Sequence, residues 1–506
     1  MNDSTKKSVT DVNLLTYGRT KIEIPLSQDE LTKENISLYL QEILTTHQKN
    51  VRECEYLYNF YKGKQPILNK NKVIREEINK IIVENHAYEI VEFKKGYEFG
   101  KPITYAHKDS ADNDDIGILN KYMLERNKDA QDLQIGEYMY IMGTAYRWVL
   151  PRKDYENIEK EAPFRLITSS PMETFVVYST RLEKEKLFGG NIVSVFDAKN
   201  PKQNKKIISI YTATKYYEFE TTDGIDFNFI KENTNGIGKI PVIEYPLNES
   251  RLSPIEVVMT MLNALNDITS NELDDVVQFV NSLLIFVNQE VTQELLNEIL
   301  ELGAMQIKTE DATRPADVKE LTKKLEHNDI NTLFERIYGK MLGIIGVPKT
   351  SDSPRSSGDT GQARLLGEGW TLADQRASSD EKMFDTAEHK MLKVVLSICK
   401  KIKNCPIQDI YTSDIEIKHN RNKDDNLLVK TQSLTNLNSA GLPKEIIAQA
   451  VNLFSDPHEV AEKWQKEADK NREEMFKINS KAVSSDTQEN ISKENKNSSN
   501  EQNIKN

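Results

Sequence analysis

Residues 253–281 read SPIEVVMTMLNALNDITSNELDDVVQFVN and give the clearest helix signal in the chain. Ser253 is a typical N-cap residue, Pro254 suits the first helical position, and Glu256 stands where its carboxylate can accept from the cap's backbone N–H. Apolar residues then recur at roughly a helical period, at Ile255, Met259, Leu262, Leu265, Ile268, Leu273, Val276 and Val280. The pattern predicts one long amphipathic helix over residues 253–281.

This helix is strongly acidic. Residues 253–288 contain no Lys or Arg and five acidic residues, namely Glu256, Asp267, Glu272, Asp274 and Asp275. A run of carboxylates is commonly a solvated helix face. A second interpretation is a wall past which DNA moves, because basic side chains would bind phosphates with release of counterions, whereas carboxylates repel them. Both interpretations stay open, and the complete absence of basic residues makes us favour the second.

A second helix is predicted over residues 329–345, before Gly346-Val347-Pro348 and a polar loop over residues 349–361. After this loop no proline occurs before Pro406, which permits a long helix over residues 362–402, with a kink or break favoured at Gly367 and Gly369. The insertion between the first two helices is too small for a core of its own. Its predicted elements are strands at 283–287, 305–308 and 318–321 and a helix at 291–302.

The rest of the chain mixes helices and strands, so the predicted class is α+β. Upstream, helices are expected from about Ser27 and over residues 85–99 and 129–142, before β-rich runs over residues 145–245. Downstream we expect a strand at 415–417, helices at 426–437, 443–454 and 457–478, and disorder over the polar residues 479–506.

Composition excludes several classes of protein. The chain has 506 residues, which allow more than one domain. Its formal net charge of −12 disfavours tight, static DNA binding but not transient contact with moving DNA. Its three cysteines lack metal-site spacing and are expected to be reduced. No apolar run approaches the roughly 18 residues that span a bilayer, and we expect folding in a cytoplasm and no membrane partner.

The sequence shows no motif of an enzyme. It contains no Walker A sequence, no His-Glu-x-x-His, no Gly-x-Ser-x-Gly and no Gly-x-Gly-x-x-Gly. The closest approach to a metal site is an Asp cluster without the glycine and distal Glu of a calcium loop, at Asp109, Asp112, Asp114 and Asp115. We therefore predict no enzyme activity, no catalytic residue, no metal and no cofactor. A dispersed carboxylate set for two-metal nuclease chemistry stays open as an alternative.

Short motifs occur in an ordered series along the chain. They are YKGKQPIL at 61–68, GYEFGKPITY at 96–105, GTAY at 143–146, SPMETFVVY at 170–178, KIPVIEY at 239–245, GVP at 346–348 and SSG at 356–358. In content and order they resemble the portal proteins of long-tailed phages that infect low-GC Gram-positive bacteria. The similarity covers roughly residues 30–475.

The resemblance implies a multi-region portal fold with wing, stem, clip and crown regions. The implied regions are a leader at 1–29, a wing at 30–252, stem helix one at 253–281, a clip at 282–325, stem helix two at 326–346, a tunnel loop at 347–361, a long tunnel helix and wing strand at 362–423, a crown at 424–478 and a disordered tail at 479–506. The implied channel loop residues are Lys349, Arg355, Ser356, Ser357 and Gly358.

The resemblance also implies a function and partners. About twelve copies would form a ring at one capsid vertex, the channel for genome packaging and ejection. The implied partners are the terminase motor, the major capsid and scaffolding proteins, head-completion and tail connector proteins, and double-stranded DNA passing through. The protein would belong to the virion, and to the host cytoplasm during assembly. The alternatives are a phage nuclease or other DNA-processing enzyme, and a cytoplasmic helical scaffold protein.

Overall fold

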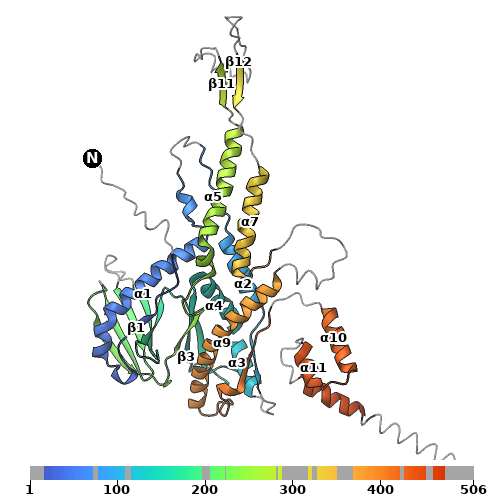
Figure 1. Cartoon of the computed structure of the whole chain (residues 1–506). Helices are drawn as coiled ribbons and strands as arrows, with labels where there is room; N and C mark the ends of the chain where they lie inside the picture. The colour runs from blue at the N-terminus through green and yellow to red at the C-terminus, as the bar shows by residue number, and fades with distance from the viewer. Residues whose placement is uncertain are drawn as a thin grey trace, which may run out of the picture. The chain divides into compact units, whose positions relative to one another are not determined.

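The computed structural model describes residues 16–71, 78–108, 115–195, 205–222, 224–280, 283–287, 317–321, 327–349, 369–421, 427–451, 460–472 and 474. The chain divides into two compact units. The larger unit comprises Met1–Lys101 and Lys121–Thr412, and the smaller unit comprises Pro102–Asn120 and Ser413–Asn506. Figure 1 shows the helices and strands of both units.

The helices of the larger unit confirm most of the predicted ones. They are α1 (Lys33–Tyr61), α2 (His86–Phe99), α4 (Lys128–Met142), α5 (Pro254–Val280), α7 (His327–Ile345) and α9 (Trp370–Lys401), with 3-10 turns η2 (Gln28–Glu30) and η3 (Pro66–Asn69). Ser27 caps η2, whereas the first long helix begins only after its own cap, Thr32. The long helix α9 begins at Trp370, later than the predicted start at residue 362. Its N-cap, Gly369, has a φ of 84°, which lies outside the helical region. Residues 362–368 lie outside the described part.

Two antiparallel sheets account for the β-rich segment. One has the order β1 (Ile22–Ile24), β5 (Thr174–Ser179), β6 (Lys186–Val195), β7 (Lys205–Tyr211), β8 (Lys215–Thr221) and β9 (Asn228–Thr234), with only β1 and β5 parallel. The other has the order β10 (Val242–Pro246), β3 (Thr144–Pro151) and β4 (Phe164–Ser169). The apolar face of α1, including Ile36, Leu40 and Ile43, packs into one core with Phe175 and Phe188 of the larger sheet. The mixed α+β class is confirmed.

The end of α4 and the start of α5 meet at a close backbone contact. Gly143 ends α4 with a φ of 79°, a region that favours glycine. A Cβ atom there would lie 1.9 Å from the carbonyl oxygen of Arg251, so no other residue fits without movement. Ser253 then donates from its hydroxyl to the carbonyl of Tyr140 at 2.7 Å. The first turn of α5 is thereby fixed on α4.

From this base α5 rises, and α7 returns beside it (Figure 1). Beyond the C-terminal end of α5 lies a two-stranded antiparallel sheet of β11 (Leu283–Val287) and β12 (Asp317–Leu321). Leu283 pairs with Leu321 in its register. The predicted strands at 283–287 and 318–321 are confirmed, whereas the helix expected at 291–302 and the strand expected at 305–308 lie outside the described residues.

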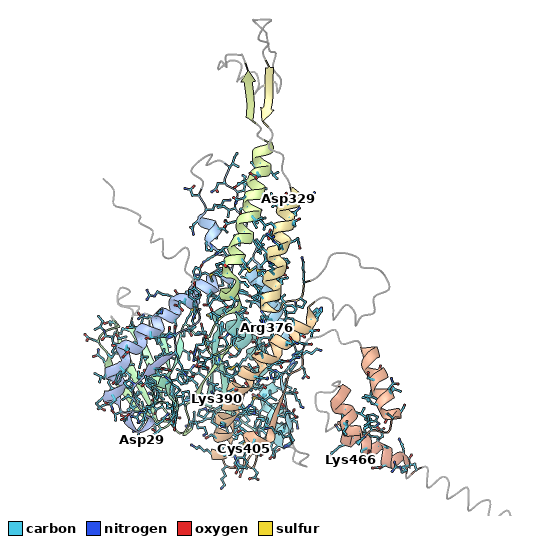
Figure 2. The ribbon with its side chains drawn as sticks, in the orientation of Figure 1. Asp29, Asp329, Arg376, Lys390, Cys405 and Lys466 are labelled. Carbon is cyan, nitrogen blue, oxygen red and sulfur yellow. The ribbon has the colours of Figure 1, made fainter. Side chains whose placement is uncertain are left out.

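The smaller unit contains a two-stranded sheet and short helices. Strand β13 (Ile415–Lys418) pairs antiparallel with β2 (Thr104–His107), which confirms the strand predicted at 415–417. The helices are α10 (Leu427–Ser439), α11 (Lys444–Val451) and a helical segment over residues 460–472, and α3 (Asp115–Glu125) runs from this unit into the other. The ammonium of Lys444 lies 5.1 Å from the ring centre of Trp464 in that segment, which also carries Lys466 (Figure 2). Residues 479–506, where disorder was predicted, are outside the described part.

Candidate functional site

The candidate site is the pair of helices α5 and α7 with the helices at their base. Its first element is the cap that the sequence predicted. The backbone N–H of Ser253 donates to the carboxylate of Glu256 at 2.7 Å, and the N–H of Ile255 donates to the Ser253 hydroxyl at 3.2 Å. These bonds satisfy donors that a helix start leaves free, so the predicted cap of α5 is confirmed.

Glu256 has a second role that the sequence did not reveal. Its carboxylate forms an ion pair with Arg19, and it accepts from the backbone N–H of Gly18 at 3.0 Å. The Glu256 side chain has no exposed surface, and Arg19 also lies 3.2 Å from Glu53. A carboxylate buried and paired within its own subunit cannot face DNA. The expectation that Glu256 lines a channel is therefore corrected.

Asp274 is likewise turned inward. It accepts from the backbone N–H of Lys80 at 2.6 Å and from the ammonium of Lys70 at 3.1 Å, and its side chain is 2% exposed. Ser270 accepts from the N–H of Ile82 at 3.0 Å, one helical turn earlier. This ladder, continued by Asn266, holds the extended segment 78–84 against α5. Asp274 is thus also removed from the expected wall.

The remaining carboxylates of α5 are accessible. Asp267 is exposed, and Glu272 and Asp275 are half-buried, each with further electrostatic contacts. No Lys or Arg occurs anywhere in α5. Of the five acidic residues of α5, these three are therefore the ones whose side chains solvent can reach.

A charged cluster joins α2 to α7 at the base of the pair. The imidazole of His86 lies 3.0 Å from Glu84 and 2.7 Å from Glu89, and the Tyr338 hydroxyl donates to Glu89 at 2.7 Å. Burial alone would lower the pKa of His86, but the hydrogen bonds and charges of the two glutamates outweigh it and raise the pKa to about 9. His86 is therefore protonated at neutral pH and bonded to both carboxylates.

The expected channel loop is described only at its first residue. Lys349 forms an ion pair with Glu335, and its ammonium lies 5.8 Å from the ring centre of Tyr338. The Lys349 side chain therefore folds back on α7. Arg355, Ser356, Ser357 and Gly358 lie outside the described residues.

A buried charge network fastens α9 to the body of the larger unit. Glu388 of α9 lies 2.8 Å from Lys128 and 3.6 Å from Arg147, and it accepts from the Tyr245 hydroxyl at 2.7 Å. Asp132 lies 2.5 Å from both cations, so two acids face two bases. All five side chains are almost wholly buried. Sequence reasoning missed this network, because its members come from α4, β3, β10 and α9.

The beginning of α9 is attached to α2. The Tyr97 hydroxyl donates to Asp374, Lys94 lies 3.5 Å from Asp380, and Trp370 contacts the Tyr97 ring at 6.0 Å between centres. Glu98 is buried close to Asp380, and desolvation together with that neighbouring charge raises the pKa of Glu98 to about 8. Figure 2 shows Arg376 where α9 meets the base of α7, and its guanidinium donates to the carbonyl of Ile344 at 3.5 Å.

The described residues were also compared with the geometry of metal sites and membrane spans. Among them, no three His, Cys, Asp or Glu side chains gather closely enough to hold a metal ion. Nor does any helix in the described part combine the length and apolar composition needed to cross a membrane. Most of the Asp cluster considered for calcium, residues 109–114, lies outside that part.

Residues 40–474 match the family model described as "Phage portal protein, SPP1 Gp6-like". The chain is 23% identical over 224 residues to the portal protein of Bacillus phage SPP1, a match that covers 41% of this chain and 41% of that protein. A chain from a structure titled "Virion of native gene transfer agent (GTA) particle" aligns with a TM-score of 0.40 and 11% identity, over 73% of this chain and 88% of that one.

Proposed function

This chain belongs to the SPP1 Gp6-like family of phage portal proteins, and we propose that it forms a ring at one capsid vertex through which the genome is packaged and ejected. The ring would contain about twelve copies, as the resemblance to portal proteins implies, joined by head-to-tail contacts that close on themselves. Portal proteins are structural rather than catalytic, and this one is a component of the virion. During assembly it would reside in the host cytoplasm.

The observation that carries the proposal is the α5–α7 pair. It presents a long helix without a basic residue, with Asp267, Glu272 and Asp275 accessible on it. In a ring, the same carboxylates would repeat around the axis and repel DNA phosphates. Because no ammonium or guanidinium on α5 competes with counterions for phosphate, DNA would slide rather than stick.

The chain can be divided into the regions that such a conduit would need. We assign the wing to residues 30–252 with 362–423, the stem to 253–281 with 326–346, the clip to 282–325, the tunnel loop to 347–361 and the crown to 424–478. The leader at 1–29 and the tail at 479–506 flank these regions. The clip would pack on neighbouring clips, since the part of it that the structure describes, β11 and β12, is a two-stranded sheet.

The anchored base gives the conduit its rigidity. The Glu388 network fixes the second half of α9, and the Asp374 and Asp380 contacts fix its first half to α2. The tunnel loop would then be held between two fixed helices, α7 and α9. Lys349 and Arg355 are its basic residues. Lys349 is paired with Glu335 of α7 in the single chain, so Arg355 is the one we expect on the DNA path.

The proposed partners follow from the place of a portal in the particle. The terminase motor would dock at the clip and later give way to head-completion and tail connector proteins. The wing and crown would contact the major capsid and scaffolding proteins. Double-stranded DNA would pass through the channel without being cut, and no cofactor would be needed.

The vertex assignment is tested by labelling. Gold-conjugated antibody against this chain is applied to tail-less heads purified from the phage that encodes it, and the heads are imaged by electron microscopy. We expect label at a single vertex in most labelled heads. Label spread over the shell, or confined to soluble material that never joins heads, would contradict the proposal.

A further inference from the structure

Helices α5 and α7 each present a mixed stripe of apolar and charged side chains outside their mutual contact. The stripe of α5 contains Val257, Thr260 and Asp267, in which Val257 is 49% exposed. Successive members lie three or seven residues apart, and therefore on one face of a helix with 3.6 residues per turn. Its one kind of charge is negative.

The stripe of α7 has the opposite charge. It contains Leu333, Arg336, Lys340, Gly343 and Ile344, with Leu333 38% and Ile344 45% exposed. Its other face, through Met341, Leu342 and Ile345, is buried. Neither Arg336 nor Lys340 forms an ion pair with another residue that the structure describes.

A chain of hydrogen bonds connects the parts of α5 and α7 that carry these charges. Tyr338 bonds to Glu89, Glu89 to His86, and His86 to Glu84. Glu84 in turn accepts from the Thr269 hydroxyl of α5 at 2.8 Å. Arg336 and Lys340 stand two residues on either side of Tyr338, and Asp267 stands two residues before Thr269, which is a rise of about 3 Å in each case.

We propose that the α5 stripe of one subunit packs on the α7 stripe of the next, with Asp267 facing Arg336 and Lys340 of the neighbouring copy. The inference rests on the proposed ring and names the chemistry that joins its subunits. A second copy is the occupant because the two stripes carry charges of opposite sign and both are exposed in the single chain. If the α5 stripes of two copies met, or the α7 stripes of two copies met, like charges would face one another. The contact therefore joins α5 of one copy to α7 of the next, is head-to-tail, and propagates around a ring.

This contact gives the accessible carboxylates of α5 two different roles. Asp267 serves subunit association, whereas Glu272 and Asp275, nearer the clip, remain for the channel wall. The exposed Val257, Leu333 and Ile344 then lose water on assembly, which supplies the nonspecific part of the association energy. The ion pairs supply its direction and register.

Reversal of charge on each side, and on both together, tests the contact. The variants are Asp267→Lys, the pair Arg336→Glu with Lys340→Glu, and the triple variant that carries all three changes. Lys382→Glu on α9 is the matched control, because it reverses an exposed charge away from both stripes. The ring fraction is measured by mass photometry across a dilution series, with folding checked by circular dichroism.

We expect each one-sided variant to lower the apparent ring stability at least tenfold, and the triple variant to restore most of it, with Lys382→Glu unchanged. Added salt should weaken the wild-type ring and strengthen the one-sided variants. One-sided variants that assemble normally, or a triple variant no better than they are, would overturn the inference while leaving the ring itself intact. Normal assembly combined with impaired packaging in Asp267→Lys would assign that carboxylate to the channel instead. A wild-type chain that forms no ring would overturn the proposed function itself.

Discussion

Glu388 of α9 and Lys128 of α4 form an ion pair of 2.8 Å in which neither side chain is more than 2% exposed. The two residues stand 260 positions apart in the sequence, and Arg147 and Asp132 complete the network around them. Buried charges of this kind are costly unless every partner is present. The network therefore fixes where α9 lies against α4 and the small sheet.

Removal of one partner should be strongly destabilising. Glu388→Ala removes one of the two carboxylates that face Lys128 and Arg147, and we expect it to lower the free energy of unfolding by about 3–5 kcal/mol. The measurement is chemical denaturation followed by circular dichroism. Lys382→Ala, an exposed change on the same helix, should stay within about 0.5 kcal/mol of wild type. Equal stability of the two variants would show that the network is dispensable.

The cluster around His86 should make stability depend on pH. Its folded pKa of about 9 lies above the unfolded value of about 6.5, so its contribution is fully present below pH 6.5 and is lost as the pH rises through 9. The contribution is on the order of 3 kcal/mol. The difference in unfolding free energy between wild type and His86→Gln should therefore shrink from pH 6 to pH 10. A difference that stays constant over this range would contradict the assignment.

The accessible carboxylates of the stem should keep DNA mobile. Glu272→Lys and Asp275→Lys would place cations where the proposed channel wall has anions, and each should reduce the DNA packaged per head. The defect should be relieved by added salt, which screens phosphate contacts. Asp409→Lys makes the same charge change at an exposed site outside the stem and should package normally. Normal packaging by both stem variants, in rings shown to be intact, would return this acidity to a solvated helix face.

The polar tail should be dispensable for assembly. Residues 479–506 are almost wholly Ser, Asn, Lys, Glu and Gln, and the family match ends at residue 474. Such a segment buries too little apolar surface to order itself. Truncation after Ile478 is expected to leave the ring fraction unchanged in mass photometry. Loss of rings on truncation would reveal a structural partner for the tail.

Local signals in the sequence identified the main elements well. Ser253, Pro254 and Glu256 correctly predicted the start of α5, because a helix cap involves residues within one turn of each other. The strands β3, β5 and β7 coincide with runs that are rich in β-branched and aromatic residues. Gly369 was expected to interrupt a helix. It is the N-cap residue of α9 and has a φ of 84°, so the helix begins after it.

The candidate site was predicted less well, because partners far away in the sequence decide which of its carboxylates are buried and which are exposed. Glu256 pairs with Arg19 across 237 positions and Asp274 with Lys70 across 204, so no local pattern distinguishes them from Asp267. One signal was available for Glu256, since a carboxylate engaged in a cap is partly turned toward its own helix. For Asp274, the four-residue spacing from Ser270 and Asn266 indicated a polar face that has a partner.

The most direct test of the account is electron cryomicroscopy of the purified full-length chain. The account predicts closed rings of about twelve subunits in which α5 borders a central channel and β11 with β12 forms one end. Asp267 should lie against Arg336 and Lys340 of the adjacent subunit, with Glu272 and Asp275 nearer the channel. A chain that remains monomeric at micromolar concentration, or rings with α5 on the outer surface, would contradict the central claim.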